Sequence, residues 1–285
     1  MPRISYVNGQ YVRHSQAVVH IEDRGYQFSD AIYEVIVVTD GRLVDEKLHF
    51  ARMERSLREI RMEMPFSPAL FRIKIAELMR LNHLTSAALY IQVSRGVAPR
   101  GHRPPQGLVP AVVMTVRPLR SPSPALVEKG VAVISVPDVR WKRPDIKSVG
   151  LLPNILAKDD AVRRGVYEAW QVNDDGVVTE GTSTNAWIVA GNRAITHPAE
   201  NAILNGVTRL ALIDMAHSLG LSIEERAFTL DEALKADEAF LTSTTAFIMP
   251  IVKIDETVIG KGKPGPKTLA LLSAYRGHIG RGGVR

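Results

Sequence analysis

The sequence contains no cysteine, and this absence excludes several kinds of chemistry. Without cysteine there can be no disulfide framework, no thiol nucleophile and no thiolate metal site. Any nucleophile must therefore be a serine, threonine, lysine or carboxylate side chain, and no metal centre is expected.

Long apolar runs are also missing. No uninterrupted stretch approaches the ~18 residues that a membrane helix needs, and the opening MPRISYVNGQYVRH lacks the apolar block of a signal peptide. The composition, 45% hydrophobic and 23% charged over 285 residues, is typical of a globular protein with a sizeable core. We therefore expect a cytoplasmic protein with no membrane partner.

Charge of one sign is in only modest excess, with a formal net charge of +6. The basic residues between Arg52 and Arg61 alternate with Glu54 and Glu59, and no aromatic side chains interleave with them. A nucleic-acid surface concentrates basic residues on one face and often adds aromatic platforms. No nucleic-acid partner is therefore expected.

The chain is predicted to contain two mixed domains of the α+β or α/β class. Residues 1–118 show two hairpins with Asn-Gly and Asp-Gly turns, two helices with apolar residues at helical spacing, and further strands. Residues 119–126 are rich in proline and serine and predict a linker. Residues 127–285 again alternate strands and helices, and the tail 280–285 is expected to be disordered.

Lys147 lies in the stretch WKRPDIKSVGLLPN, between a strand-like run and a helix. A lysine in a loop is ordinarily a solvated surface charge. Arg140, Lys142 and Arg143 would lower the pKa of its amine if they approached it in space, which is how a lysine becomes nucleophilic near neutral pH. The residues alone leave both interpretations open.

Arg100 and His102 lie two positions apart in the loop SRGVAPRGHRPP. In an extended chain such residues point to the same side, so both could contact one carboxylate, the arginine through its forked guanidinium. The alternative is a basic, solvated loop stiffened by proline. Tyr33, in SDAIYEVIVV, has the pattern of a half-buried strand aromatic.

Polar groups also occur where strands end and helices begin. Gly206, Val207 and Thr208 open a helix, where free N–H groups and a hydroxyl can bind an anion or only cap the helix. The hydroxyl cluster 242–245 ends a strand and could equally be a solvated turn. Glu180, in VVTEGTSTN, could accept a hydrogen bond from a ring N–H or serve as a turn residue.

These segments occur together in one order: EDRGYQFSDAIYEV, YIQVSRGVAPRGH, DIKSVGLLPNILAK, VTEGTSTNAW, ILNGVTR and TSTTAF. The ordered set resembles the class IV, or fold type IV, pyridoxal-phosphate aminotransferases over nearly the whole chain. Within that family it is most similar to the D-amino acid aminotransferases. The resemblance implies a homodimer of two-domain α/β subunits, with pyridoxal 5′-phosphate at the domain interface.

The resemblance also implies roles for individual residues. Lys147 is similar to the lysine that forms a Schiff base with the cofactor and later acts as general base, and Glu180 to the partner of the pyridinium nitrogen. Leu204 is similar to the residue that packs against the face of the cofactor ring. The residues that resemble the family's phosphate-binding set are Arg52, Val207, Thr208 and Thr244.

Substrate class depends on three other positions. Tyr33, Arg100 and His102 resemble the residues with which D-amino acid enzymes hold the substrate α-carboxylate. The implied donors are D-alanine or D-glutamate and the implied acceptors 2-oxoglutarate or pyruvate. Ser29 and Ala31 stand where the best-known bacterial member has glycines, and Pro144 and Asn154 also differ from it; the first pair bears on the width of the substrate pocket.

Rival interpretations follow from the same scaffold. An (R)-amine transaminase, a branched-chain aminotransferase or an aminodeoxychorismate lyase would share the lysine and the glutamate, so these two residues do not decide the substrate. A non-catalytic basic binding protein is the alternative of a different class.

Overall fold

The computed structural model describes residues 3–120 and 122–280 and forms two compact units. The first unit comprises residues 3–120 and 146–150, and the second comprises residues 122–145 and 151–280. The predicted domain division at 119–126 stays a prediction. The structure also shows that residues 146–150, far along the chain, pack with the first unit. Of the tail 280–285, which was predicted to be disordered, Gly280 lies in a helix, and 281–285 lie outside the described residues.

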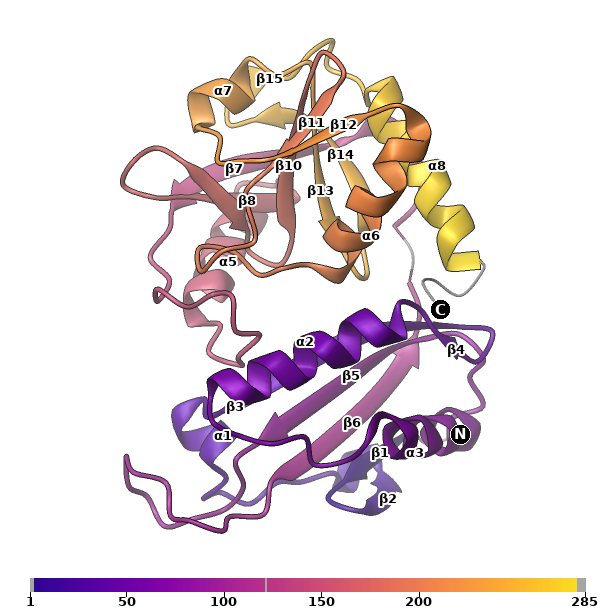
Figure 1. Ribbon diagram of the computed structural model, residues 1–285, viewed down its shortest axis with the longest axis vertical. Coiled ribbons are helices and arrows are strands. Elements are labelled where there is room, and N and C mark those ends of the chain that lie inside the picture. Colours follow the sequence, from indigo (N-terminus) through magenta and orange to yellow (C-terminus); the bar gives the residue numbers. More distant parts are fainter. Residues whose placement is uncertain (1–2, 121, 281–285) are drawn as a thin grey trace. The chain divides into compact units, whose positions relative to one another are not determined.

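The first unit is a six-stranded antiparallel sheet in the order β2-β1-β6-β5-β3-β4 (Figure 1). The Asn8-Gly9 and Asp40-Gly41 turns have positive φ at both residues, the geometry that two-residue hairpins favour, so the predicted hairpins are confirmed. Its elements are β1 (Ile4–Val7), β2 (Gln10–Arg13), a short 3-10 helix (His14–Gln16), α1 (Arg24–Phe28), β3 (Ala31–Thr39), β4 (Arg42–Leu43), α2 (Glu46–Glu59), α3 (Pro68–Leu81), β5 (Ala87–Ser94) and β6 (Ala111–Pro118).

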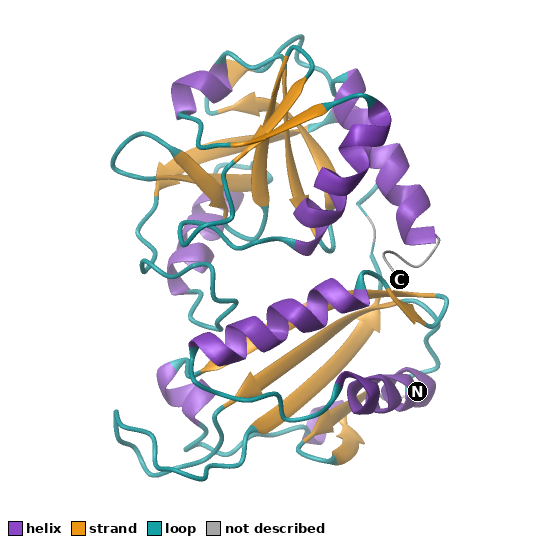
Figure 2. Cartoon of the chain, in the orientation of Figure 1, coloured by secondary structure: helices purple, strands orange, loops and turns teal. Residues whose placement is uncertain are grey.

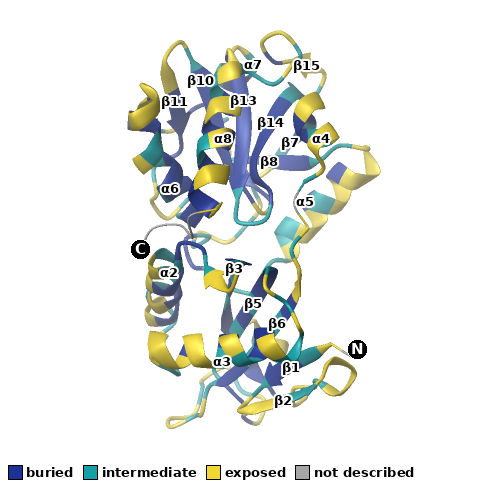
Figure 3. Cartoon of the chain, turned by 90° about the vertical axis from the view of Figure 1, so that its right-hand side faces the viewer, coloured by how far each residue is buried: buried dark blue, intermediate teal, exposed yellow. Residues whose placement is uncertain are grey.

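Helices α2 and α3 cover one face of this sheet. Their apolar stripes, including Phe50 and Leu57 of α2 and Phe71 of α3, pack against inward-facing strand residues such as Ile36 and Ile91. Because side chains alternate along a strand, the opposite face carries the other set of residues, among them the half-buried side chains of the site described below. Figure 3 shows the strands largely buried and the outer faces of the helices exposed.

Segment 146–150 extends the first unit along the beginning of β3. The amide of Tyr33 donates to the carbonyl of Lys147 at 2.9 Å, and the amide of Val149 donates to the carbonyl of Ala31 at 3.2 Å. Ile146 is buried in the same core as α2 and α3. The lysine is thus carried by a short piece of chain that behaves as an added strand.

The second unit contains a nine-stranded mixed sheet. The strands run in the order β12-β11-β10-β13-β14-β7-β8-β9, with β15 paired to β14, and only β7–β8, β7–β14 and β11–β12 are parallel pairs. Its elements are α4 (Pro124–Lys129), β7 (Val131–Pro137), α5 (Leu152–Arg163), β8 (Glu168–Val172), β9 (Val178–Gly181), β10 (Asn185–Ala190), β11 (Arg193–Thr196), α6 (Val207–Ala216), a 3-10 helix (His217–Leu219), β12 (Ser222–Glu225), α7 (Leu230–Leu234), β13 (Glu238–Ser243), β14 (Phe247–Ile254), β15 (Thr257–Val258) and α8 (Pro266–Gly280).

Both units mix helices with sheets, which confirms the predicted α/β class (Figure 2). In the second unit α6 packs beside β13, and α8 packs on β13 and β14. Strands β9, β10 and β13 are almost wholly buried, so the polar residues on them are held within the unit. Among the described residues no helix is long and apolar enough to cross a membrane.

Candidate active site

Lys147 is half-buried and ordered by its neighbours. Its backbone N–H donates to Oγ of Ser56, a fully buried residue of α2, at 3.3 Å. Its Nζ lies 4.3 Å from the centre of the Tyr33 ring, a cation–π contact. The sequence left open whether this lysine is a solvated loop charge. The structure holds its backbone against β3 and α2 and its amine against an aromatic ring.

Tyr33 and Tyr90 form an aromatic pair on the open face of the first sheet. Their rings stack with centres 5.7 Å apart, and the Tyr90 hydroxyl donates to Oε1 of Gln92 at 2.8 Å. Burial raises the pKa of Tyr90 to about 12, helped by the nearby Tyr33. Tyr90 is therefore neutral at physiological pH, and the stacked rings give the lysine an ordered aromatic wall.

Arg52, on α2, is held by the buried carboxylate of Glu34 on β3. Glu34 accepts from Nε of Arg52 at 3.0 Å and from Nη2 at 2.5 Å, and Nδ1 of His49 lies 3.0 Å from the same carboxylate. Burial alone would raise the pKa of Glu34, but Arg52 and His49 outweigh it, so the pKa lies well below its usual range. Burial lowers the pKa of His49. The guanidinium is thus fixed along two of its nitrogens.

Arg100 and His102 lie in the exposed loop between β5 and β6. Both contact Phe28 of α1: the Arg100 guanidinium lies 4.7 Å from the ring centre, and the His102 ring lies 5.8 Å from it. The structure therefore brings these two residues to one aromatic side chain. Tyr33 has different neighbours, namely Lys147 and Tyr90.

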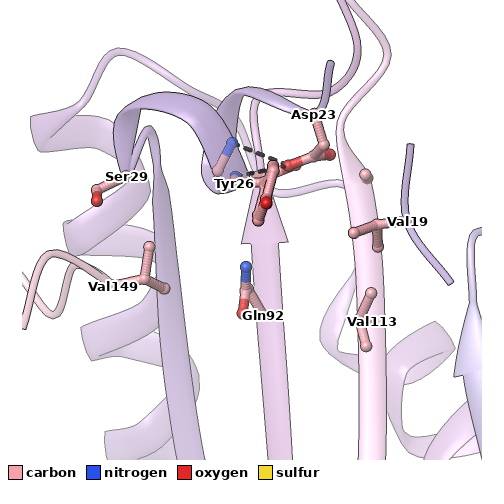
Figure 4. A pocket seen from close by; sticks show the side chains of 10 residues that line it. Val19, Asp23, Tyr26, Ser29, Gln92, Val113 and Val149 are labelled. Atoms are coloured by element: carbon pink, nitrogen blue, oxygen red, sulfur yellow. Dashed lines mark hydrogen bonds between the residues drawn. The ribbon is translucent and has the colours of Figure 1, made fainter. Parts of the chain in front are cut away.

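A pocket of about 380 Å³ opens on the first unit beside α1 (Figure 4). Asp23 borders it and accepts hydrogen bonds from the amides of Gly25 and Tyr26 and from Oγ of Ser94, at 2.8, 3.4 and 2.7 Å. Ser29 also lines it and has a left-handed backbone with φ of 57°. Glycine is the usual residue at such a helix end. The left-handed backbone therefore explains why a glycine suits position 29. The expectation that Ser29 affects the width of the substrate pocket stays a prediction.

Glu180 is the penultimate residue of β9 in the second unit and is buried among donors. Its Oε2 accepts from Nδ2 of Asn185 and from the amide of Leu204, each at 3.1 Å. Its Oε1 forms an ion pair with Nη1 of Arg140. The side chain of Asn185 also donates to the carbonyl of Leu204 at 2.8 Å, so the leucine and the glutamate are fixed to each other.

Arg140 is itself held by several acceptors. It pairs with Asp138 at 2.7 Å and donates to the carbonyl of Ala202 at 3.2 Å. Burial lowers the pKa of this guanidinium, but Asp138 and Glu180 reverse the effect and raise it above its ordinary value. The sequence singled out Arg140 only as a group that could influence the amine of Lys147; the structure instead shows it bonded to carboxylates.

The start of α6 supplies a set of groups suited to an anion. Val207 and Thr208 are buried in its first turn, and Oγ1 of Thr208 lies 3.2 Å from the hydroxyl of Tyr275 on α8. Thr244 is half-buried in the turn between β13 and β14, the strands on which α6 and α8 pack. Unpaired amides of a first turn, together with hydroxyls, attract a phosphate.

Four residues of this arrangement were missed from the sequence as functional positions: Glu34, Ser56, Arg140 and Asn185. Glu34 and Asn185 lie inside the motif blocks EDRGYQFSDAIYEV and VTEGTSTNAW, so their position was a signal. Nothing in the local pattern indicates that Ser56 meets Lys147 or that Arg140 meets Glu180, because each of these contacts spans a long stretch of chain. Residues 3–120 and 122–280 contain no group of three potential ligands able to hold a metal ion.

Comparison with known proteins gives a consistent result. The sequence model of the family described as amino-transferase class IV matches residues 31–254. A D-alanine aminotransferase of Bacillus licheniformis is 42% identical over 272 residues, 95% of each chain, and one of Staphylococcus haemolyticus is 37% identical over 274 residues, 96% of this chain and 97% of that one.

Solved structures agree on the fold. The branched-chain amino acid aminotransferase of Escherichia coli superposes with a TM-score of 0.90 at 25% identity, covering 97% of this chain and 94% of that one. The branched-chain enzyme of T.th., complexed with N-(5′-phosphopyridoxyl)-L-glutamate, has a TM-score of 0.90 at 26% identity, with 98% and 94% covered.

Proposed function

Because this chain belongs to the class IV aminotransferase family, we propose that it is a D-amino acid aminotransferase, which moves the amino group of a D-amino acid to a 2-oxo acid with pyridoxal 5′-phosphate. One observation carries the proposal: D-alanine aminotransferases are 37–42% identical to this chain over at least 95% of its length. The proposed donors are D-alanine and D-glutamate, and the proposed acceptors are 2-oxoglutarate and pyruvate.

The residues present fit pyridoxal phosphate. Glu180 is a carboxylate that is only 6% exposed and is surrounded by donors, as suits an anion that must face a protonated ring nitrogen. The first turn of α6 and the hydroxyl of Thr208 offer donors to a phosphate, and we assign Arg52 and Thr244 to the same phosphate and Leu204 to the ring face. When bound, the cofactor supplies an electron sink for the pair left when the substrate loses its Cα proton.

Lys147 is the proposed catalytic residue. Its amine would hold the cofactor and, when free of it, would act as the general base that moves a proton at the substrate Cα. The hydrogen bond to Ser56 and the Tyr33 ring limit where this amine can lie. A base confined to one side of the reacting carbon acts on one stereoisomer, which is how a fixed lysine gives selectivity for D-amino acids.

Arg100, His102 and Tyr33 are the proposed contacts of the substrate α-carboxylate. Within the described residues Arg100 pairs with no carboxylate of the protein, unlike Arg52 and Arg140. An arginine whose charge is not neutralised internally, beside a histidine on the same loop, is suited to bind a substrate carboxylate through two parallel hydrogen bonds.

The main rivals use the same scaffold. Branched-chain aminotransferases share the fold at 25–26% identity, well below the 37–42% of the D-alanine enzymes. An (R)-amine transaminase turns over amine donors that have no α-carboxylate for such a clamp to bind. Activity towards a donor without a carboxylate therefore separates an (R)-amine transaminase from the proposed function.

We further propose a homodimer, formed through an exposed apolar patch on the first unit. The patch comprises Val18, Ile21, Tyr26, Val97 and Val109, of which Val109 is 82% exposed. The segments 18–26 and 97–109, which carry these residues, lie side by side. The amide of residue 24 donates to the carbonyl of residue 96, and the amide of residue 98 donates to the carbonyl of residue 22. Large exposed apolar patches commonly mark protein interfaces. The patch flanks the loop that carries Arg100, so such a dimer would bring that loop to the subunit boundary.

The cytoplasmic location expected from the sequence stays a prediction that cell fractionation can check.

The dimer is checked by analytical ultracentrifugation of the wild type and of an Ile21→Asp/Val109→Asp variant. The wild type should sediment as a dimer and the variant as a monomer. A wild type that sediments as a monomer would contradict the dimer, and a variant that remains a dimer would contradict the proposed patch.

A spectrum of the purified holoenzyme tests the function most directly. Addition of D-alanine should convert the absorbance of the lysine-attached cofactor to that of its pyridoxamine form, and L-alanine at the same concentration should leave it unchanged. 2-Oxoglutarate should then restore the first spectrum. Faster conversion by (R)-1-phenylethylamine than by D-alanine would replace the proposed function with an (R)-amine transaminase.

A further inference from the structure

Arg24 is a buried arginine to which no role has yet been assigned. It opens α1, its side chain is 4% exposed, and it pairs with Asp30 through Nε at 2.8 Å. Burying a guanidinium costs several kcal/mol unless its donors are satisfied. The other two nitrogens of Arg24 are satisfied by backbone carbonyls of one loop, which shows what this buried charge holds.

Those carbonyls belong to the loop that carries Arg100 and His102. Nη1 of Arg24 donates to the carbonyl of Gly101 at 2.7 Å, and Nη2 donates to the carbonyl of His102 at 3.1 Å. The two acceptors belong to successive peptide units, so the fork of Arg24 fixes the backbone on both sides of His102. The first of these units lies between Arg100 and His102, the two side chains proposed to bind the substrate carboxylate.

Phe28 connects the same arginine to the Arg100 side chain. The guanidinium carbon atoms of Arg24 and Arg100 each lie 4.7 Å from the centre of its ring. Each cation–π contact contributes about 0.5–1 kcal/mol at an exposed site and more when desolvated. Arg24 thus fixes the backbone of the loop, while Phe28 limits the directions in which the Arg100 side chain can point.

We propose that Arg24, together with Phe28, is a positioning residue for recognition of the substrate carboxylate. This inference rests on the proposed function, because it takes Arg100 and His102 as the carboxylate clamp. The loop is exposed and contains several prolines and glycines, so without a brace it would pay conformational entropy each time it bound a carboxylate. The buried ion pair Arg24–Asp30 lowers that cost by keeping the loop in place before the substrate arrives.

Arg95 provides a matched control. It binds the same carboxylate, with Nε and Nη2 at 2.7 and 2.8 Å from the oxygens of Asp30, and it also donates to a backbone carbonyl, that of Ile60, at 2.6 Å. The carbonyl of Ile60 directly follows α2, whereas the carbonyls that Arg24 binds lie in the loop after β5. Arg24→Lys and Arg95→Lys therefore each remove a guanidinium that binds Asp30, and only the first removes hydrogen bonds to the carbonyls of Gly101 and His102.

The experiment uses the holoenzyme in single-turnover mode, with D-alanine varied and the limiting rate and apparent dissociation constant measured separately. Arg24→Lys should raise the apparent dissociation constant by about 10-fold, the loss of one charge-assisted hydrogen bond network, while changing the limiting rate less than about threefold. Calorimetry with propionate, a carboxylate without an amine, should show the same weakening. Arg95→Lys should change neither constant by more than about twofold.

Phe28→Leu serves as a second variant if Arg24→Lys does not fold. It retains an apolar side chain, removes both cation–π contacts, and should weaken D-alanine and propionate binding by about threefold. If neither ligand weakens in Phe28→Leu, or if Arg24→Lys and Arg95→Lys behave alike while the wild type binds both ligands, the positioning role is wrong and the proposed function stands. If the wild type itself binds neither D-alanine nor propionate, the proposed function fails and the inference fails with it.

Discussion

Each compact unit contains one buried glutamate–arginine pair, and the two pairs have opposite proposed roles. In the first unit Glu34 is fully buried and holds Arg52, the arginine assigned to the cofactor phosphate. In the second unit Arg140 is nearly buried and holds Glu180, the carboxylate assigned to the ring nitrogen. The same ion pair thus orients a cation in one unit and an anion in the other.

The difference shows why one member of each pair was found in the sequence and the other was not. A buried charge needs a partner of opposite sign, and that partner is placed by the fold rather than by local sequence. Arg100 is a third case, since it faces the ring of Phe28 and pairs with no carboxylate in the described part of the chain. An arginine of this kind is suited to receive its anion from the substrate.

The largest effect is expected at Lys147, which belongs to neither pair. Lys147→Ala should lower transamination by at least about 10⁴-fold, the upper range for loss of a positioned base, with the fold retained. Borohydride reduction of the wild type followed by peptide mapping should place the pyridoxyl group on Lys147. A pyridoxyl group on Lys158 instead would refute the assignment.

Glu180→Gln tests the functional member of the second pair. The amide keeps the size and shape of the carboxylate, but it has one acceptor oxygen instead of two and holds a pyridinium proton poorly, so Cα deprotonation should slow by about 10²- to 10³-fold while the cofactor stays bound. Stopped-flow absorbance with D-alanine measures the step. An unchanged deprotonation rate would mean that Glu180 is only a structural partner of Arg140.

Arg100→Ala tests the arginine without an internal partner. Loss of a charge-assisted contact to a carboxylate should lower kcat/KM for D-alanine by about 30- to 1000-fold, with little change in cofactor binding. Turnover of (R)-1-phenylethylamine should already be poor and should change little. D-alanine turnover within about twofold of the wild type would remove Arg100 from the clamp.

Glu34→Gln tests the supporting member of the first pair. It should weaken cofactor affinity by about 10-fold, because Arg52 loses the charge that orients it, and should leave the deprotonation rate of the saturated enzyme within about threefold. Equilibrium dialysis against pyridoxal phosphate measures the first quantity. If this variant instead slowed deprotonation as strongly as Glu180→Gln, the opposite roles of the two pairs would be wrong.

The smallest effect concerns stability in acid. The pKa of Glu34 is lowered in the folded state, so its contribution to stability is fully present above the ordinary carboxyl value of 4.5 and is lost as the pH falls below it. Urea midpoints between pH 6 and pH 3 should therefore fall more steeply for the wild type than for Glu34→Gln. Glu256→Gln is the control, because Glu256 also has a lowered pKa but is 95% exposed and screened by solvent, so its acid limb should match that of the wild type.

The sequence was sufficient to predict the two hairpins, the helices with apolar residues at helical spacing and the class of fold, whereas the short helices α1 and α4 were not predicted. The Asn-Gly and Asp-Gly turns and the spacing of Phe50, Met53 and Leu57 are local signals, and the structure confirms them. It was also sufficient to predict the candidate residues that belong to the family's ordered motifs, whose functional roles are the proposals made above.

The parts that could not be predicted depend on long-range contacts. The bond between Ser56 and Lys147 joins positions 91 residues apart, and that between Arg24 and His102 joins positions 78 apart. No periodicity or turn signal encodes such a meeting, because it exists only after the sheet has formed. Ser29 is an intermediate case: its left-handed backbone explains the preference for glycine there, which the sequence could register only as a departure.

Segment 146–150 has a consequence for how the protein could be divided. Two separate segments of the chain form the first unit. The second of them, 146–150, supplies Ile146 to the core and two backbone hydrogen bonds to β3. A fragment that ends near residue 120 would therefore leave part of that core unfilled and would leave the beginning of β3 paired on one side only, with β5. A cut there would divide the first unit, because the proposed catalytic lysine lies beyond residue 120 in the sequence and yet folds as part of the first unit.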